Sequence, residues 1–151
     1  MLVAEILESK DPRIIAIQPD SVVRETANVL KQERIGVALV RESDGSLVGI
    51  ISERDIVRCV AEHGEAALEK SVAELMSRDV ITCTPDSSTE ELIEKMLANK
   101  VRHLPVLKGH ALVGVVSVND VMKSVLGELK WREQVLRDHV VAATGWATDD
   151  D

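Results

Sequence analysis

Short runs of apolar residues, bounded by glycine, proline and polar residues, alternate along the chain with segments in which apolar residues recur every three to four positions. The runs predict buried strands, and the periodic segments predict amphipathic helices. Strands are expected at residues 14–17, 36–40, 47–51, 80–83, 102–107 and 111–116. Helices are expected at residues 1–9, 19–33, 53–63 and 87–99, and a longer helix is expected to begin near Asn119.

The stretch GVVSVND at residues 114–120 has a near copy, GIISERD, 65 positions earlier at residues 49–55. In each copy an apolar strand ends at a serine, and a helical pattern begins at the aspartate three residues later. The Pro-Asp-Ser sequence at residues 19–21 also returns, at residues 85–87. This self-similarity predicts an α/β fold made of two copies of one β-α-β-β-α unit. The units are expected at residues 1–66 and 67–130, followed by a C-terminal helix extension and a frayed acidic tail in residues 131–151.

Composition and charge exclude several classes of partner. Hydrophobic residues make up 45% of the chain, but Phe and Tyr are absent, which leaves Trp131 and Trp146 as the aromatic side chains that could stack on a base. The formal net charge of −8 argues against nucleic acid and anionic membranes, which need a basic face. No basic and apolar leader and no apolar run near the ~20 residues of a membrane span is present, so a soluble cytoplasmic protein is expected.

The reactive residue types form no recognisable catalytic or metal-binding pattern. Cys59 and Cys83 lack CxxC spacing and lie in apolar segments, so we expect buried thiols, with a disulfide as the alternative. The histidines are scattered, which predicts no metal site. No serine or cysteine has a recognisable histidine and acid partner, and the motif GxxxxGKS/T is absent, so an enzyme is not expected.

The repeated GhhSxxD stretch (h, apolar), together with the VRHLPV strand at residues 101–106, resembles the tandem cystathionine β-synthase (CBS) domain pair, also called the Bateman module. The resemblance covers roughly residues 1–130. It implies two repeats related by pseudo-two-fold symmetry, in a small regulatory or sensor protein. It also implies two clefts between the repeats that bind AMP, ADP or ATP, and in some members S-adenosylmethionine or NAD.

The resemblance also assigns residues of this chain to the two clefts. Ribose binding falls to Asp55 with Ser52 in one cleft and to Asp120 with Ser117 in the other. Backbone contacts to adenine fall to Val80 and Ile81 beside Asp55, and to Ile14 and Ile15 beside Asp120. A carboxylate can accept hydrogen bonds from both hydroxyls of a ribose, which gives the assignment a physical basis.

Phosphate groups need cationic donors, and the strand before Asp120 supplies Arg102 and His103. Further candidates for a shared anion pocket are Arg54, Arg58 and Lys123. In the first unit, Gly36 and Val37 stand at the positions of Arg102 and His103. We therefore expect the Asp120 cleft to hold a phosphate better than the Asp55 cleft.

Two alternatives remain from the sequence alone. Ser-x-x-Asp at a helix start is also the pattern of a capping box, in which the aspartate serves the backbone instead of a ligand. The alternative to a nucleotide-binding module is a ligand-free dimerisation or interaction module within a larger complex. Trp131 and the overlong last helix predict a homodimer, and an unknown target protein is a further expected partner.

Overall fold

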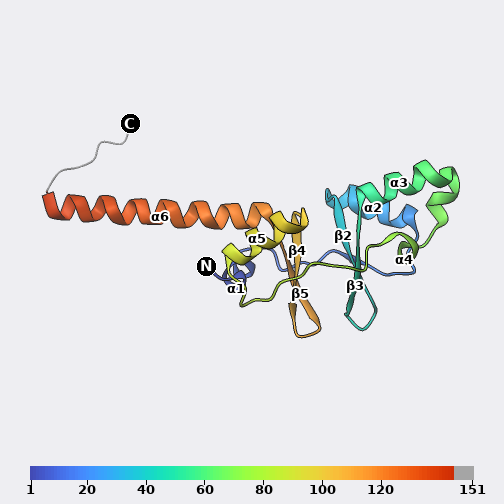
Figure 1. Cartoon of the computed structure of the whole chain (residues 1–151), viewed down its shortest axis with the longest axis horizontal. Helices are drawn as coiled ribbons and strands as arrows, with labels where there is room; N and C mark the ends of the chain where they lie inside the picture. The colour runs from blue at the N-terminus through green and yellow to red at the C-terminus, as the bar shows by residue number, and fades with distance from the viewer. Residues whose placement is uncertain (145–151) are drawn as a thin grey trace.

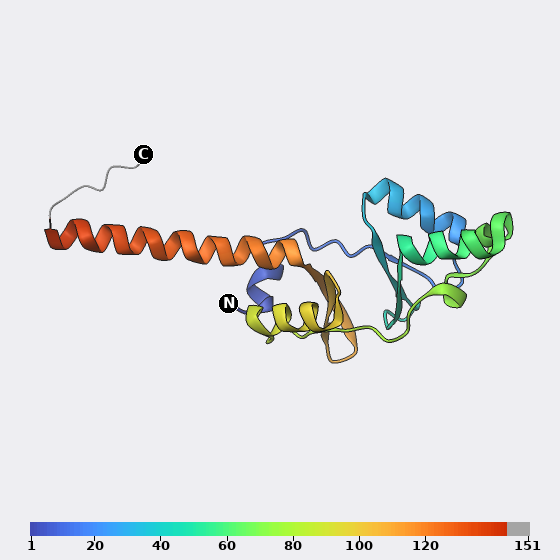
Figure 2. The ribbon, with the colours of Figure 1, turned by 45° about the horizontal axis from the view of Figure 1, so that its top comes forward.

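The computed structural model describes residues 1–144, so the predicted frayed tail and Trp146 lie outside the described residues. The first repeat contains β1 (Ala16–Ile17), α2 (Val23–Glu33), β2 (Val37–Arg41), β3 (Leu47–Ser52) and α3 (Glu53–His63). The second contains α5 (Thr89–Asn99), β4 (His103–Lys108), β5 (Ala111–Ser117) and α6 (Val118–Thr144). Two lead-in helices, α1 (Val3–Glu8) and α4 (Val72–Leu75), and the 3₁₀ helix η1 (Gly64–Glu69) complete the described chain. The repeats lie side by side, with α6 projecting from one end (Figure 1, Figure 2).

Each repeat is built on a β-hairpin, as the sequence predicts. β2 pairs antiparallel with β3, and β4 pairs antiparallel with β5. Gly45 and Gly109 take positive φ angles of 91° and 64° in the two turns, a conformation that a side chain disfavours. The prediction that α3 ends before Gly64 is also confirmed, since this glycine caps the helix with a φ of 60°.

The prediction of a strand at residues 80–83 is wrong, and that of a strand at residues 14–17 is right only for Ala16 and Ile17. At residues 80–83, a single parallel bridge joins Cys83 to Val106. The reason lies in the path of the chain. Just before this segment Ser77 pairs with Ile50 of the first repeat, so residues 78–82 cross from one repeat to the other and have no neighbouring strand.

Two helices begin later than predicted, α2 at Val23 and α5 at Thr89. The Pro-Asp-Ser residues before them form turns whose carbonyl groups serve the lead-in helices. Pro19 and Ser21 accept hydrogen bonds from backbone amides of α4, and Pro85 and Ser87 accept them from α1. These carbonyl groups bind a different segment, so they do not start the helix that follows.

The lead-in helices are exchanged between the repeats. Val3 and Ile6 of α1 are buried with Leu92, Leu104 and other residues of the second repeat. Val72 of α4 and the following Met76 are buried with Ile51 and other residues of the first repeat. Each lead-in segment packs closely against a glycine of the repeat that it contacts. A Cβ on Gly49 would be 2.6 Å from the Met76 sulfur, and one on Gly114 would be 2.7 Å from a Leu7 methyl.

Both cysteines are free and buried, as predicted. Burial raises the pKa of the Cys83 thiol to about 11, so this group is a protonated core side chain. None of the helices in the described part of the chain combines the length and apolar character needed to cross a bilayer.

Candidate functional site

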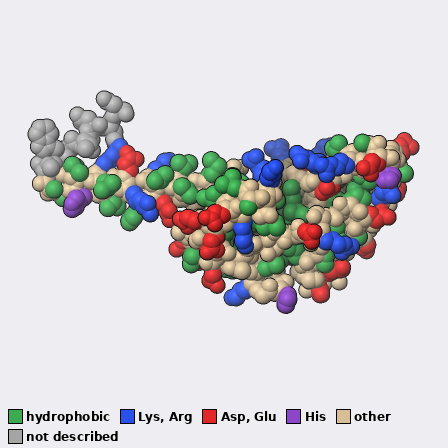
Figure 3. All heavy atoms as spheres, viewed as in Figure 1, with side chains coloured by type: hydrophobic (Ala, Val, Ile, Leu, Met, Phe, Trp, Pro, Cys, Tyr) green, Lys and Arg blue, Asp and Glu red, His purple; other side chains and the backbone are tan. Residues whose placement is uncertain are grey.

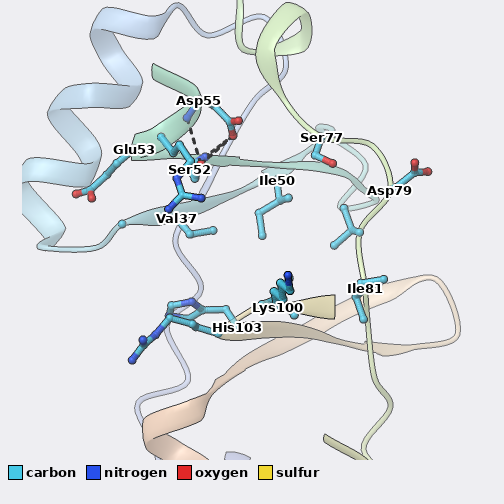
Figure 4. Close-up of a pocket in the computed structure, with 15 residues that line it drawn as sticks. Val37, Ile50, Ser52, Glu53, Asp55, Ser77, Asp79, Ile81, Lys100 and His103 are labelled. Atoms are coloured by element: carbon cyan, nitrogen blue, oxygen red, sulfur yellow. Dashed lines mark hydrogen bonds between the residues drawn. The ribbon is translucent and has the colours of Figure 1, made fainter. Parts of the chain in front are cut away.

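A cavity of about 680 Å³ lies between the repeats. One wall is formed by β2, the end of β3 and the start of α3. The other is formed by Ser77, by residues 79–81 of the crossing segment, and by residues 100–103, which lead into β4. Figure 4 shows Ser52 and Asp55 on one side of the cavity and Lys100 and His103 on the other.

Asp55 lies at the start of α3 and forms the capping box that the alternative interpretation predicts. Its Oδ2 accepts hydrogen bonds from the Ser52 amide at 2.9 Å and the Ser52 hydroxyl at 3.0 Å. The Asp55 amide in turn donates to the Ser52 hydroxyl oxygen at 3.3 Å. Within residues 1–144, no hydrogen bond is recorded to Oδ1 of Asp55. The box therefore commits one carboxylate oxygen and leaves the other able to accept a ligand hydroxyl.

The cavity wall carries charges of both signs. Its cationic side chains are Arg54, Lys100 and Arg102, and its acidic ones are Glu53, Asp55 and Asp79. Burial lowers the pKa of His103, and the nearby Lys10 lowers it further, while Asp120 opposes the shift. The imidazole is therefore neutral at pH 7 in the absence of a ligand. An anionic ligand would meet three exposed cationic side chains and a histidine able to donate a hydrogen bond.

Seven of the residues assigned from the sequence line this cavity. They are Ser52, Arg54, Asp55, Val80, Ile81, Arg102 and His103. Arg102 and His103, which were expected at the Asp120 cleft, line the cavity of Asp55. Both residues reach this cavity because β4 approaches the first repeat at its amino end. His103 also lies near Asp120, since it pairs with Ser117 in the sheet and its pKa responds to the Asp120 charge.

The other assigned residues lie elsewhere. Arg58 lines a groove of about 300 Å³ between α3 and α4, which Asp55 also lines. Asp120 and Lys123 line a separate groove of about 370 Å³ beside α1. Ser117 caps α6 next to Asp120, and Ile14 and Ile15 are half-buried on the segment before β1. The structure therefore gathers the candidates at one cavity and leaves the second set dispersed.

Sequence reasoning missed Lys100 and Lys10. Lys100 follows α5 with a φ of 54°, and Arg34 follows α2 with a φ of 55°, 66 positions earlier. The sequence thus has a cationic residue at the end of each of the two corresponding helices, and this repeated feature could have identified Lys100 as a candidate. Lys10 contacts Asp120 across 110 positions of sequence and has no such signal.

Asp120 also forms a capping box, but its environment differs. Its Oδ2 accepts hydrogen bonds from the Ser117 amide at 2.8 Å and from the Lys10 ammonium at 2.7 Å. Burial by itself would raise the pKa of the Asp120 carboxyl, but the hydrogen bonds from Lys10 and Ser117 outweigh it and lower the pKa. Within residues 1–144 no cluster of His, Cys, Asp and Glu side chains is arranged to hold a metal ion.

Comparison with known protein families matches residues 3–62 and 72–127 to the CBS domain. The chain belongs to the CBS domain family. The fold is the expected one, with two tandem α/β repeats. A CBS-domain protein from Agrobacterium tumefaciens is 35% identical with a TM-score of 0.76, and the match covers 82% of this chain and 98% of that one.

Two similar solved structures contain ligands. A CBS domain protein from Pyrobaculum aerophilum, complexed with AMP, is 30% identical with a TM-score of 0.70, over 80% of this chain and 89% of that one. The CBS domain pair of protein MJ0100, in complex with 5′-methylthioadenosine and S-adenosyl-L-methionine, is 29% identical with a TM-score of 0.72, over 85% of this chain and 98% of that one. CBS domain pairs similar to this chain thus bind adenosine compounds.

Proposed function

We propose that this CBS domain pair is a regulatory module, not an enzyme, and that it binds an adenine nucleotide of the AMP, ADP or ATP class in the Asp55 cavity. The observation that carries the proposal is the composition of that cavity. It combines a helix-start carboxylate with one uncommitted oxygen from the first repeat and cationic side chains from the second.

The ligand has an assigned orientation in this proposal. The ribose hydroxyls donate to Asp55, and Ser52 lies beside them. Adenine packs against apolar groups and meets the backbone of Val80 and Ile81 on the crossing segment. The phosphates extend toward Arg102, His103, Lys100 and Arg54, which favours a phosphate over the cationic sulfonium of S-adenosylmethionine.

A ligand in this position would contact both repeats at once. Its binding free energy would therefore stabilise one placement of the repeats relative to each other. This is the physical basis of a regulatory role, in which nucleotide level sets the conformation that a target protein meets.

AMP is expected to raise the melting temperature of the protein. A ligand at 100 times its dissociation constant adds ~2.7 kcal/mol to the free energy of unfolding. Thermal melting with AMP, ADP and ATP, beside S-adenosylmethionine and NAD, measures the effect and ranks the ligands. The matched control is 2′,3′-dideoxyadenosine 5′-monophosphate, which lacks the hydroxyls that Asp55 would accept and should shift the melting temperature less. No shift with any of these ligands would favour the ligand-free interaction module.

We also propose a homodimer formed through α5 and α6. These helices line an apolar groove of about 380 Å³ with Ile93, Met96, Leu97, Val118, Val121, Met122, Val125 and Leu126. The apolar stripe continues along α6 through Leu129, Leu136 and Val140, all more than 40% exposed. Figure 3 shows apolar side chains exposed along this helix. An apolar surface of this length on a charged protein is typical of an interface.

The occupant that fits this surface is a second copy. Met122, Leu129 and Leu136 recur every seven residues, with Leu126 and Val140 four residues after the first and third, which is the spacing of a helix–helix seam. The remaining position of this pattern, four residues after Leu129, is Glu133, which is paired with Arg137. Lys123, Lys130 and Arg137 follow one edge of this seam, whereas Glu90 and Glu94 lie along the α5 edge of the groove. An antiparallel pair would place basic edges against acidic ones. Trp131 is 68% exposed but lies about 200° around the helix from Leu129, so it is not part of this seam.

Leu126→Glu is expected to convert the dimer into a monomer, because it places a charge in the centre of the seam. Light scattering should give twice the chain mass of 16.5 kDa for the parent and 16.5 kDa for the variant. The control is Val113→Glu, on the exposed face of β5, which should remain dimeric. A parent of monomer mass at micromolar concentration would contradict the proposal.

A further inference from the structure

The two capping-box aspartates, Asp55 and Asp120, differ in whether a cationic side chain of the protein forms an ion pair with them. Asp55 has no ion pair within residues 1–144. Asp120 is paired with Lys10 at 2.7 Å, and the side chains of Lys10 and Asp120 are only 31% and 18% exposed. The pair is therefore mostly covered by protein, and water does not screen it as it screens a surface pair.

Lys10 is held by a second hydrogen bond, because its ammonium also donates to the Val115 carbonyl oxygen at 2.7 Å. The corresponding carbonyl in the first repeat is that of Ile50, 65 positions earlier, and it accepts a backbone hydrogen bond from Ser77 at 2.9 Å. In the first repeat, a backbone amide thus satisfies the strand carbonyl group, and the space beside Asp55 stays open. In the second repeat, one lysine satisfies both the strand carbonyl and the aspartate.

The two aspartates also differ in the spaces that they line. The Asp55 cavity has about 680 Å³ and is lined by both repeats. The groove at Asp120 has about 370 Å³ and lies between α1 and α6. Its counterpart in the first repeat is the groove of about 300 Å³ between α3 and α4, which Asp55 also lines. The ammonium of Lys10 stands at the carboxylate that a ribose would need.

We propose that Lys10 is a built-in occupant of the second cleft, which limits the chain to one adenosine ligand, bound at Asp55. This inference rests on the proposed function of the Asp55 cavity. The capping box and Lys10 both use Oδ2 of Asp120, so a ribose that reached Oδ1 would meet the ammonium at the same carboxylate. Displacing the ammonium would break its two hydrogen bonds and leave a mostly buried cation without its partner. Lys10 thus determines the stoichiometry of binding, and it distinguishes two clefts that the repeated sequence makes look alike.

The test is isothermal titration calorimetry of the full chain with AMP. The parent is expected to bind one AMP per chain. Lys10→Met keeps a side chain of similar length but removes the ammonium, and it is expected to bind two. The matched control is Lys31→Met, which removes an exposed lysine on α2 and should bind one.

Aspartate variants locate the sites. Asp55→Ala is expected to abolish AMP binding in the parent, whereas Asp55→Ala combined with Lys10→Met should retain one site. Two AMP per chain in the parent, or one in folded Lys10→Met, would overturn the inference and leave the proposed function standing. Residual binding of one AMP by Asp55→Ala would also overturn it, and this arm does not need Lys10→Met to fold. No binding of AMP by any of these proteins would overturn the proposed function and the inference together.

Discussion

Asp55→Glu is expected to leave the melting temperature of the free protein unchanged and to weaken AMP binding at least tenfold. Glutamate is a usual acid at this position of a capping box, so the box with Ser52 can persist. The extra methylene moves the carboxylate toward the ribose and disturbs charge-assisted hydrogen bonds worth ~1.5 to 3 kcal/mol each. Calorimetry measures the affinity, and thermal melting without ligand measures the cap.

This substitution separates the two roles of Asp55, because it should preserve the capping box while it weakens ribose binding. Asp86→Glu, at an exposed carboxylate on the turn before α5, is the control and should change neither quantity. Undiminished AMP affinity in Asp55→Glu would remove Asp55 from the site. A large fall in the melting temperature of the free protein would show that glutamate cannot replace the cap, and the affinity would then have to be measured on the folded fraction.

Gly49→Ala is expected to lower the free energy of unfolding by about 1 to 3 kcal/mol, because it overpacks the junction between β3 and the segment after α4. The added Cβ would lie 2.6 Å from the Met76 sulfur and 2.9 Å from the Ser77 carbonyl oxygen. The carbonyl belongs to the bridge between Ser77 and Ile50, so the backbone itself has to move. Urea denaturation measures the change.

Gly114→Ala is the matched control in the second repeat. There the closest atoms to the added Cβ all belong to the Leu7 side chain, the nearest of them a terminal methyl at 2.7 Å, and a side-chain rotation can relieve the contact. The expected loss is therefore smaller than at Gly49. A larger loss at Gly114 than at Gly49 would contradict this account of the two junctions.

Local and repeated features of the fold could be predicted from the sequence. Both hairpins, the C-terminal end of α3 at Gly64 and the two GhhSxxD stretches follow from turn residues, apolar spacing and self-similarity within short windows. The pattern of apolar and polar residues within a short window does not indicate which repeat a crossing segment will contact. For this reason residues 80–83 were expected to form a strand although they have almost no strand beside them.

In the candidate site too, local features could be predicted from the sequence and contacts between the repeats could not. Ser52 and Asp55 are three residues apart, and their shared role at the start of α3 could be predicted. The placement of Arg102 and His103 at Asp55, and of Lys10 at Asp120, depends on contacts between the repeats. A comparison of the two units aligns Arg102 with Gly36, but it cannot tell which cleft the arginine faces.

The exchange of lead-in helices also bears on how the chain folds during synthesis. Val3 donates its amide hydrogen to the Ser87 carbonyl at 2.9 Å, and it is buried among residues as late as Val121. Helix α1 therefore has no packing partner until the second repeat has been synthesised as far as Val121. The first repeat likewise lacks Val72 and Met76 until the second has begun to emerge. We expect the two repeats to become stable together once the second repeat has been synthesised, with α1 exposed to chaperones until then.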